Sequence, residues 1–112
     1  MKKVQYDHQP PRLEAVGNGS WLYRWDIKEI PAAEETDAVF ECLEVLVWGT
    51  PTREIITAAV LTSMWPANEE AKLINDYNAA KEGLLDNRYL QFYLDFIADR
   101  ATLKAEIKSF FK

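Results

Sequence analysis

The chain has 112 residues, 48% of them hydrophobic and 28% charged, which fits one ordinary globular domain and disfavours a disordered or fibrous protein. Its 13 basic and 18 acidic side chains give a net charge of −5. This charge argues against a non-specific nucleic-acid binder, because such proteins need a basic face. A single cysteine and a single histidine exclude an internal disulfide and a zinc site built from several such ligands.

The first half of the chain predicts β-strands. Residues 1–12 contain two adjacent prolines and show no hydrophobic period, so we expect an extended arm or a short edge segment there. The Gly-Asn-Gly run at 17–19 tolerates positive φ, and it predicts a hairpin turn between strands near 12–16 and 20–29. After an acidic loop, residues 39–48 are rich in β-branched and aromatic side chains and predict a third strand, antiparallel to the second.

The second half predicts three helices. The first begins with Thr50 as its N-cap and a proline at the first helical position, and it ends near Trp65, ahead of another proline. The second begins at Asn68 with an acidic first turn and ends near Gly83. The third covers about 87–110, where apolar residues recur at a spacing of three and four.

Together these elements predict an α+β fold. A small antiparallel three-stranded sheet in the N-terminal half packs against two or three C-terminal helices, the last two of which form a long helical hairpin. We expect a single domain over 1–112, with an arm at 1–12, a sheet region at 13–49 and a helical region at 50–112. The sequence shows neither a secretory signal nor an apolar run long enough to cross a membrane, so we expect a cytoplasmic protein.

An aromatic stripe marks the second predicted strand. Side chains alternate along a strand, so Trp21, Tyr23 and Trp25 share one face while Arg24 and Asp26 lie on the other. Such a stripe is more often the inner face of a small sheet that helices cover. The alternative is an exposed patch that stacks on sugars or bases or binds a partner, because stacking needs only exposed ring faces.

The end of the last predicted helix is basic, whereas the rest of the chain is acidic. The helix dipole favours cations at a C-terminus, and this accounts for such a cluster without any function. The alternative is a docking surface, because a protruding helix end with two phenylalanines can insert into a partner groove or pair with its own copy. The residues of this predicted surface are Arg100, Lys104, Lys108, Phe110 and Phe111.

The sequence holds no persuasive catalytic or metal-binding set. Cys42 lies in a predicted strand, where a buried structural cysteine is expected, and His8 lies in the irregular arm with nothing nearby to complete a site. The acidic cluster Glu34, Glu35 and Asp37 lacks the spaced oxygen ligands and the glycine of a calcium loop, so we expect a solvated loop. We therefore predict no catalytic residue, no metal and no cofactor.

Three segments carry a resemblance to a known group of proteins. They are the Gly-Asn-Gly hairpin followed by Tyr-Arg-Trp-Asp-Ile, the strand end Val-Trp-Gly-Thr-Pro-Thr-Arg, and the run Ala-Lys-Leu-Ile-Asn-Asp-Tyr-Asn-Ala-Ala. In this order, over residues 6–85, they resemble small prophage-encoded proteins of gut bacteria. A short β-region followed by helices is also similar to phage tail-fibre assembly chaperones and other small tail accessory proteins. The resemblance implies a place among tail proteins and transfers no functional residue.

Two functions from different classes follow. The first is a non-enzymatic protein-interaction module, a phage or prophage structural or tail-assembly accessory protein that binds a protein partner or its own copy, in the cytoplasm or in a virion. The alternative is a small-ligand or carbohydrate-binding domain that uses the aromatic sheet face. An enzyme would need Cys42 and His8 to meet in a pocket. We expect no nucleic-acid partner and no membrane partner.

Overall fold

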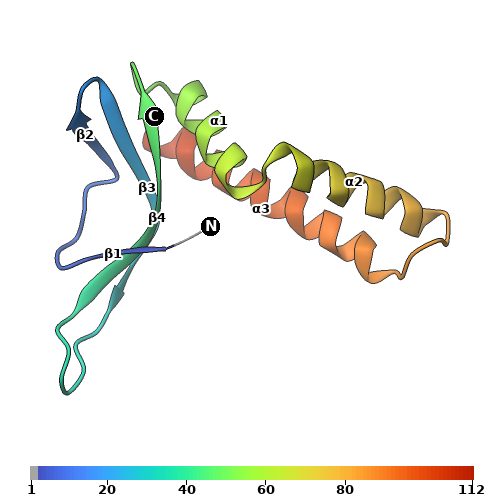
Figure 1. The fold of residues 1–112 in the computed structure, drawn as a ribbon, viewed down its shortest axis with the longest axis horizontal. Coiled ribbons are helices and arrows are strands. Elements are labelled where there is room, and N and C mark those ends of the chain that lie inside the picture. Colours follow the sequence, from blue (N-terminus) through green and yellow to red (C-terminus); the bar gives the residue numbers. More distant parts are fainter. Residues whose placement is uncertain (1–2) are drawn as a thin grey trace. The chain divides into compact units, whose positions relative to one another are not determined.

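The computed structural model describes residues 3–112, so residues 1–2 of the predicted arm lie outside the described residues. Within the described part, four strands precede three helices along the chain (Figure 1). Their bounds are β1 Val4–Tyr6, β2 Leu13–Gly17, β3 Ser20–Ile30, β4 Val39–Trp48, α1 Arg53–Met64, α2 Ala67–Lys81 and α3 Arg88–Phe110. The predicted α+β class and the antiparallel pairing of the strands are confirmed.

The strands form one antiparallel sheet in the order β1-β4-β3-β2. The prediction of three strands was one short: β1 lies within residues 1–12, where we expected an extended arm or a short edge segment, and it pairs with β4. Three residues are too few to show a period of two, so the hydrophobic pattern does not mark this strand. Its pairing with β4 defines it, and β1 and β2 become the two edges of the sheet.

The predicted hairpin turn joins β2 to β3. Gly17, Asn18 and Gly19 all adopt positive φ, at 94°, 55° and 73°, which is the conformation that this run was expected to tolerate. The Ser20 hydroxyl donates a hydrogen bond to the Gly17 carbonyl at 2.6 Å. The turn therefore sets the start of β3 against the end of β2.

A β-bulge interrupts strand β3 at Asp26. The φ of Asp26 is 55°, and the pairing of β3 with β4 skips from Trp25 to Lys28. The regular alternation of side chains along β3 therefore ends at Trp25, because a bulge inserts extra residues into one strand. Tyr23 and Trp25 share one face on the regular side of the bulge, as predicted, and their rings are 6.1 Å apart and stacked.

Helix α1 begins later than its sequence predicted. Its first residue is Arg53, and the hydroxyl of Thr52 rather than that of Thr50 accepts the amide hydrogen bond of Ile55, at 3.3 Å. Both threonines are suitable capping residues, so the sequence alone does not decide between them. Helix α2 also starts without the expected side-chain cap from Asn68.

The chain forms two compact units, Met1–Ala59 and Val60–Lys112, which we call the sheet unit and the helical unit. The boundary falls inside α1, whereas the sequence predicted one domain whose helical region starts at residue 50. Each unit has its own buried apolar side chains. In the sheet unit they are Tyr23, Trp25, Cys42, Leu43, Val47 and Ile56, and in the helical unit they are Val60, Ala80, Phe96 and Ile107.

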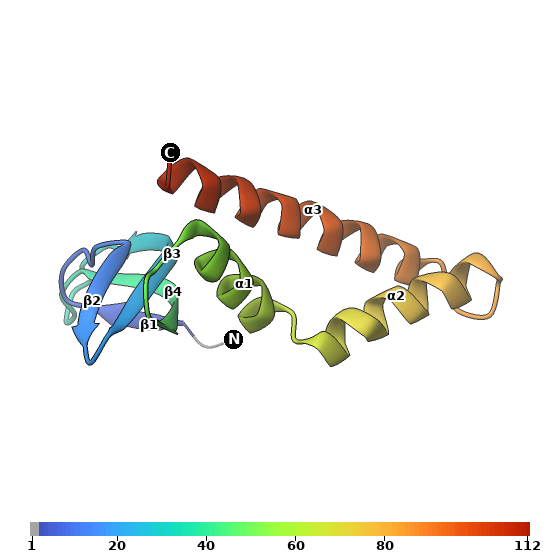
Figure 2. The ribbon, with the colours of Figure 1, turned by 90° about the horizontal axis from the view of Figure 1, so that it is seen from above.

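Helices α2 and α3 lie side by side as the predicted helical hairpin (Figures 1 and 2). The rings of Tyr77 and Tyr93 hold the two helices together, with centroids 4.5 Å apart. Gly83, with φ of 78°, reverses the chain after α2, and its amide donates to the carbonyl of Ala80 at 3.1 Å. The glycine therefore ends α2 near the predicted position.

Candidate functional site

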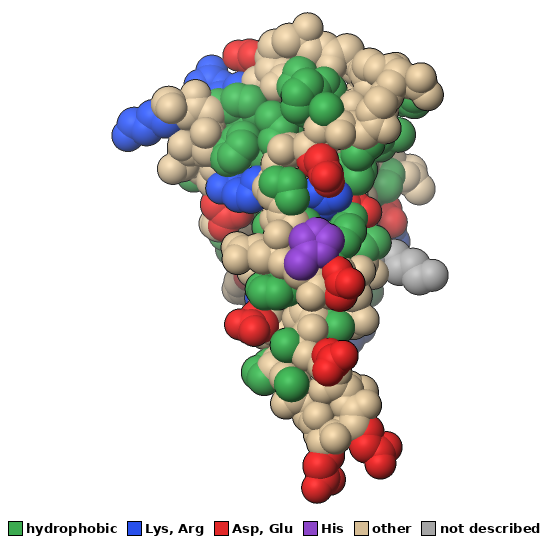
Figure 3. Space-filling model, turned by 90° about the vertical axis from the view of Figure 1, so that its left-hand side faces the viewer, with side chains coloured by type: hydrophobic (Ala, Val, Ile, Leu, Met, Phe, Trp, Pro, Cys, Tyr) green, Lys and Arg blue, Asp and Glu red, His purple; other side chains and the backbone are tan. Residues whose placement is uncertain are grey.

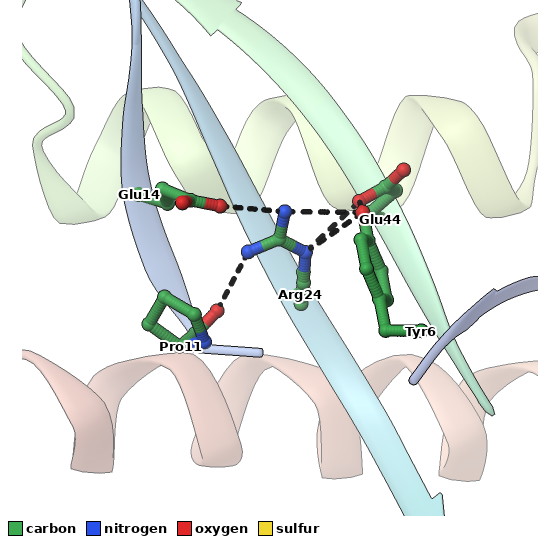
Figure 4. Close-up of polar contacts among 5 residues, drawn as sticks. All are labelled: Tyr6, Pro11, Glu14, Arg24 and Glu44. Atoms are coloured by element: carbon green, nitrogen blue, oxygen red, sulfur yellow. Dashed lines mark hydrogen bonds and ion pairs between the residues drawn. The ribbon is translucent and has the colours of Figure 1, made fainter. Parts of the chain in front are cut away.

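A polar cluster surrounds Arg24 in the sheet unit (Figure 4). This charged residue is only 2% exposed. Its Nε donates to Glu44 Oε2 at 3.0 Å, and its Nη2 lies 2.8 Å from Glu14 Oε1. Nε and Nη2 also donate to the Tyr6 hydroxyl, at 3.3 and 3.1 Å, and Nη1 donates to the Pro11 carbonyl at 2.9 Å. We call these five residues the arginine cluster.

Each partner of Arg24 comes from a different segment of the sheet unit. The strand register places Arg24 of β3 directly opposite Glu44 of β4. Tyr6 belongs to β1, Glu14 to β2, and Pro11 to the loop between those two strands. One guanidinium group therefore ties all four strands together. In the described residues every buried side-chain nitrogen and oxygen atom has a hydrogen-bond partner, so the cluster offers no unpaired buried donor to a ligand.

The pKa values of Arg24 and Tyr6 are both raised in the arginine cluster. Burial disfavours the charge of Arg24, but hydrogen bonds with Glu14, Tyr6 and Glu44 outweigh burial and raise the pKa of Arg24. Burial raises the pKa of Tyr6, and so does the hydrogen bond of 2.6 Å that its hydroxyl donates to Glu44. Neither Arg24 nor Tyr6 is placed to act as a base near neutral pH, so the cluster acts as a structural clamp.

In Tyr6→Phe, the free energy of unfolding is expected to fall less than in the wild type as the pH rises in the alkaline range. The folded-state pKa of Tyr6 lies above its ordinary value of 10.0, so the native state binds this proton more tightly than the unfolded state. The stability from this group is present below pH 10.0 and is lost as the pH rises through the folded-state pKa. Urea unfolding on both sides of that pH measures the difference.

The matched control for Tyr6→Phe is Tyr77→Phe, since Tyr77 lies on α2 and outside the arginine cluster. The control variant is expected to lose stability at alkaline pH as the wild type does. An identical pH dependence in Tyr6→Phe and in the wild type would show that the Tyr6 proton does not contribute to stability.

An exposed apolar patch continues along the face of the sheet that carries Arg24. From the Arg24–Glu44 pair, the next pairs on this face are Leu22 with Leu46 and Ser20 with Trp48. Trp48 is 63% exposed and Leu46 is 46% exposed, and Leu22 is half-buried. We call Leu22, Leu46 and Trp48 the sheet patch. In the space-filling view, hydrophobic side chains gather in the upper part, and acidic ones are scattered from there down to the narrow lower end (Figure 3).

The predicted aromatic platform is largely a core. Tyr23 and Trp25 are buried, so neither ring can contact a partner or a sugar in this structure, and both are corrected from candidate contact residues to core residues. The opposing residues on β4 are Val45 and Leu43, so apolar neighbours surround these rings on their own face. Trp21 is half-buried, and its role in binding stays a prediction.

The predicted docking surface on α3 divides into two parts. Lys104 and Lys108 are exposed, and Arg100 is half-buried. Phe110 and Phe111 are half-buried as well, and their rings meet edge-to-face with centroids 5.0 Å apart. The two phenylalanines therefore pack on each other, while the lysines extend into solvent.

Cys42 is buried and His8 is exposed, and this difference bears on whether they could act as a catalytic pair. Cys42 is buried, and its burial raises the pKa of the thiol, which lowers the fraction of reactive thiolate. The His8 side chain is exposed, and its Nδ1 lies 2.7 Å from Asp7 Oδ1. That contact with His8 lowers the pKa of Asp7. The hypothesis of a cysteine–histidine pair gains no support from this geometry.

The acidic loop between β3 and β4 is solvated. Glu34, Glu35 and Asp37 are exposed, and a backbone bridge between Ala33 and Thr36 makes the turn. Among residues 3–112, no three acidic, histidine or cysteine side chains lie close enough to hold a metal ion together. A partner that bound this loop would therefore be attracted by the negative charge of its carboxylates.

The sequence pattern indicates neither the arginine cluster nor the sheet patch. Alternation puts Arg24 on a charged face but does not identify Glu44 as its partner, because only the register between β3 and β4 sets the two opposite each other. Trp48 ends its strand next to Gly49, and the strand pattern alone does not show that its ring is 63% exposed. The 17–19 turn fixes only the register of β2 with β3, and no sequence signal fixes the register of β3 with β4 on which both features depend.

No protein-family model, no curated protein and no solved structure matches this chain. In the part of the chain that the structure describes, no helix is both long and apolar enough to cross a bilayer. The surfaces and contacts of the two units are therefore the basis for a functional proposal.

Proposed function

We propose that this protein is a non-enzymatic interaction module that binds a protein partner through its sheet patch. The observation that carries the proposal is the exposure of Trp48 beside Leu46 on one face of the sheet. Large aromatic side chains that lie exposed next to other apolar residues mark protein-binding surfaces, since tryptophan dominates the energetics of many interfaces.

The arginine cluster supports this proposal because it makes the sheet patch rigid. Arg24 and Glu44 lie directly next to the Leu22–Leu46 pair along β3 and β4. Five contacts of one buried guanidinium hold the strands in place. A preorganised surface binds more tightly, because less conformational entropy is lost when the complex forms.

The charge of the sheet unit indicates the chemistry of the partner. Residues 1–59 carry ten acidic and six basic side chains, a net charge of −4. Glu14 lies at the same face as the sheet patch, and the Glu14 side chain is 44% exposed. A partner segment with apolar side chains flanked by lysine or arginine would complement both the patch and its acidic surroundings.

The resemblance to prophage-encoded proteins supports a place for the module in phage assembly. Small proteins of this kind act as structural or tail-assembly accessory proteins, so the proposed partner is a phage structural protein. This placement puts the protein in the cytoplasm during assembly or in the finished virion. A non-enzymatic role agrees with the buried thiol of Cys42 and the exposed imidazole of His8.

Substitution of the sheet patch is expected to weaken capture of the partner. The protein is immobilised, exposed to extract from cells that produce phage, and the bound proteins are identified by mass spectrometry. Leu46→Ser with Trp48→Ser should lower the affinity for the captured phage protein by about thirtyfold, as expected for loss of an aromatic anchor. Circular dichroism of each variant confirms that the fold is retained.

The matched control is Leu84→Ser, because Leu84 is even more exposed than Trp48 but lies in the turn after α2. This variant should bind the phage protein as the wild type does. Equal affinity of the double variant, or recovery of no phage structural protein by the wild type, contradicts the proposed function.

A further inference from the structure

The backbone of β4 is covered only in part on the side that faces β1. Strand β1 pairs with residues 40–42 of β4. Strand β4 extends to Trp48, and no other strand of the described residues 3–112 lies on this side of it. Residues 43–48 therefore have no paired strand on this side, and we call them the β4 edge.

A backbone hydrogen bond shows which residues of β4 point their backbone groups toward the β4 edge. The Gly49 amide donates to the carbonyl of Gly19, directly before β3, at 2.8 Å. In an antiparallel strand the amide and carbonyl of one residue point to the same side, and successive residues alternate. Val47 therefore bonds to β3 as Gly49 does. Leu46 and Trp48 point their amides and carbonyls away from β3, at the β4 edge.

A second hydrogen bond, on the other side of β3, agrees with this assignment. The Arg24 amide donates to the Arg12 carbonyl at 2.7 Å, so the backbone groups of Arg24 point toward β2 and away from β4. The pairs between β3 and β4 that exchange no backbone hydrogen bonds are therefore Arg24–Glu44, Leu22–Leu46 and Ser20–Trp48. The two β4 residues of the sheet patch thus present both apolar side chains and outward backbone groups.

The edge formed by β2 is less suited to an added strand than the β4 edge. Two prolines lie just before β2, and its pairing is irregular between Ala15 and Gly17. Prolines and bulges are features that block pairing at a sheet edge. The β4 edge contains no proline, and its one charged residue, Glu44, is bound by the arginine cluster. Leu46 and Trp48 are 46% and 63% exposed. The β4 edge is therefore open to another chain.

An extended polypeptide is the ligand whose chemistry fits the β4 edge. Amides and carbonyls that point outward at every second residue match the backbone of another strand, whereas a helix uses its own backbone groups internally. Side chains alternate along an added strand, so every second one lies beside Leu46 and Trp48 on the face of the sheet patch. The negative charge of the sheet unit favours lysine or arginine at the ends of this segment.

We infer that the partner binds as an extended segment that adds a strand to the β4 edge. Its main chain exchanges hydrogen bonds with Leu46 and Trp48, and its alternate apolar side chains cover the sheet patch. The inference rests on the proposed function and deepens it, because it names the part of the partner that binds. That part is a linear segment with apolar residues at every second position, flanked by lysine or arginine.

Synthetic peptides test whether a linear segment is sufficient. The probes are overlapping peptides of about twelve residues that together span the captured phage protein, long enough for one strand. One of them should bind the immobilised protein. Methylation of its backbone nitrogens, one at a time, should lower its affinity about tenfold at alternate positions and leave it unchanged at the positions between, because only every second amide of an added strand faces β4.

An ester in place of one backbone amide separates the backbone contact from the side chains. The α-hydroxy acid of leucine at position 46, introduced by nonsense suppression, keeps the side chain and removes the N–H. It should weaken binding of the peptide about fivefold, as expected for one hydrogen bond. Urea unfolding confirms that the chain stays folded.

The matched control is the α-hydroxy acid of alanine at position 15. Arg12 bonds to Arg24, so alternation along β2 points the amide of Ala15 away from β3, at the opposite edge of the sheet. The control chain should bind the peptide as the wild type does, because only the β4 edge receives the added strand.

Three results would overturn this inference and leave the proposed function in place. They are patch-dependent capture of a phage protein none of whose peptides binds, sensitivity to N-methylation without a period of two, and unchanged peptide binding by the ester at position 46. A dimeric wild type in sedimentation equilibrium that binds no peptide also overturns it, since a second copy then occupies the edge. If the wild type captures no phage protein, the proposed function fails and the inference fails with it.

Discussion

Arg24→Met is expected to lower the free energy of unfolding by about 3 kcal/mol, because it removes one partner of a buried charged network and leaves the others behind. Urea unfolding followed by tryptophan fluorescence measures this loss, since Trp25 lies next to Arg24 on β3. A change of this size is a large fraction of the total stability of a small domain. It should be the largest effect of any single substitution at a charged residue in the sheet unit.

The geometry of the arginine cluster explains the expected size of the loss. Without the guanidinium, the Glu44 carboxylate and the Tyr6 hydroxyl lose donors in a site where water is scarce, and Pro11 loses the donor to its carbonyl. The Glu14 side chain is 44% exposed, so water can solvate it after the substitution. The expected loss of stability is therefore at the lower end of the range for removing one partner of a buried ion pair.

The control for Arg24→Met is Arg53→Met. Arg53 is exposed, and its Nη2 lies 3.4 Å from Glu54 Oε1. Loss of this surface pair should change the free energy of unfolding by less than about 0.5 kcal/mol. Arg24→Lys should fall between the two, because one ammonium group cannot reach four partners as the planar guanidinium does. Equal stability of Arg24→Met and Arg53→Met would show that the cluster does not hold the sheet together.

The strand and helix positions could be predicted because local chemistry determines them. The Gly17–Gly19 turn requires positive φ, and the run of β-branched and aromatic residues at 39–48 favours an extended chain. The pairing of β1 depends instead on contacts with β4, which lies more than thirty residues away in the sequence. No local pattern encodes such a contact, so the sequence leaves open whether residues 1–12 form an arm or an edge segment.

The functional surface was harder to predict because the strand register decides it. The stripe at Tyr23 and Trp25 was correctly placed on one face, but the period of two does not say which face is buried. The same alternation puts Arg24 on the opposite face, together with other charged residues. Burial of that charge becomes reasonable only when Glu44 is known to lie directly opposite.

Phe96→Ala is expected to lower the free energy of unfolding of the helical unit by about 3 kcal/mol, because it leaves a cavity in an aromatic cluster. Phe96 is 4% exposed. Its ring centroid lies 5.1 Å from that of Trp65 and 6.1 Å from that of Tyr93. Far-ultraviolet circular dichroism during urea unfolding measures the loss, since α2 and α3 supply most of the helical residues.

Phe92→Ala is the matched control, because the two phenylalanines are one helical turn apart on α3 and differ mainly in burial. Phe92 is 48% exposed and meets only the edge of Tyr89 among the described ring contacts, so its removal should cost less than about 1 kcal/mol. The difference between the two variants isolates the contribution of the buried cluster. Similar losses in both variants would mean that Phe96 does not pack as the structure shows, and that the hairpin is held together by its other contacts.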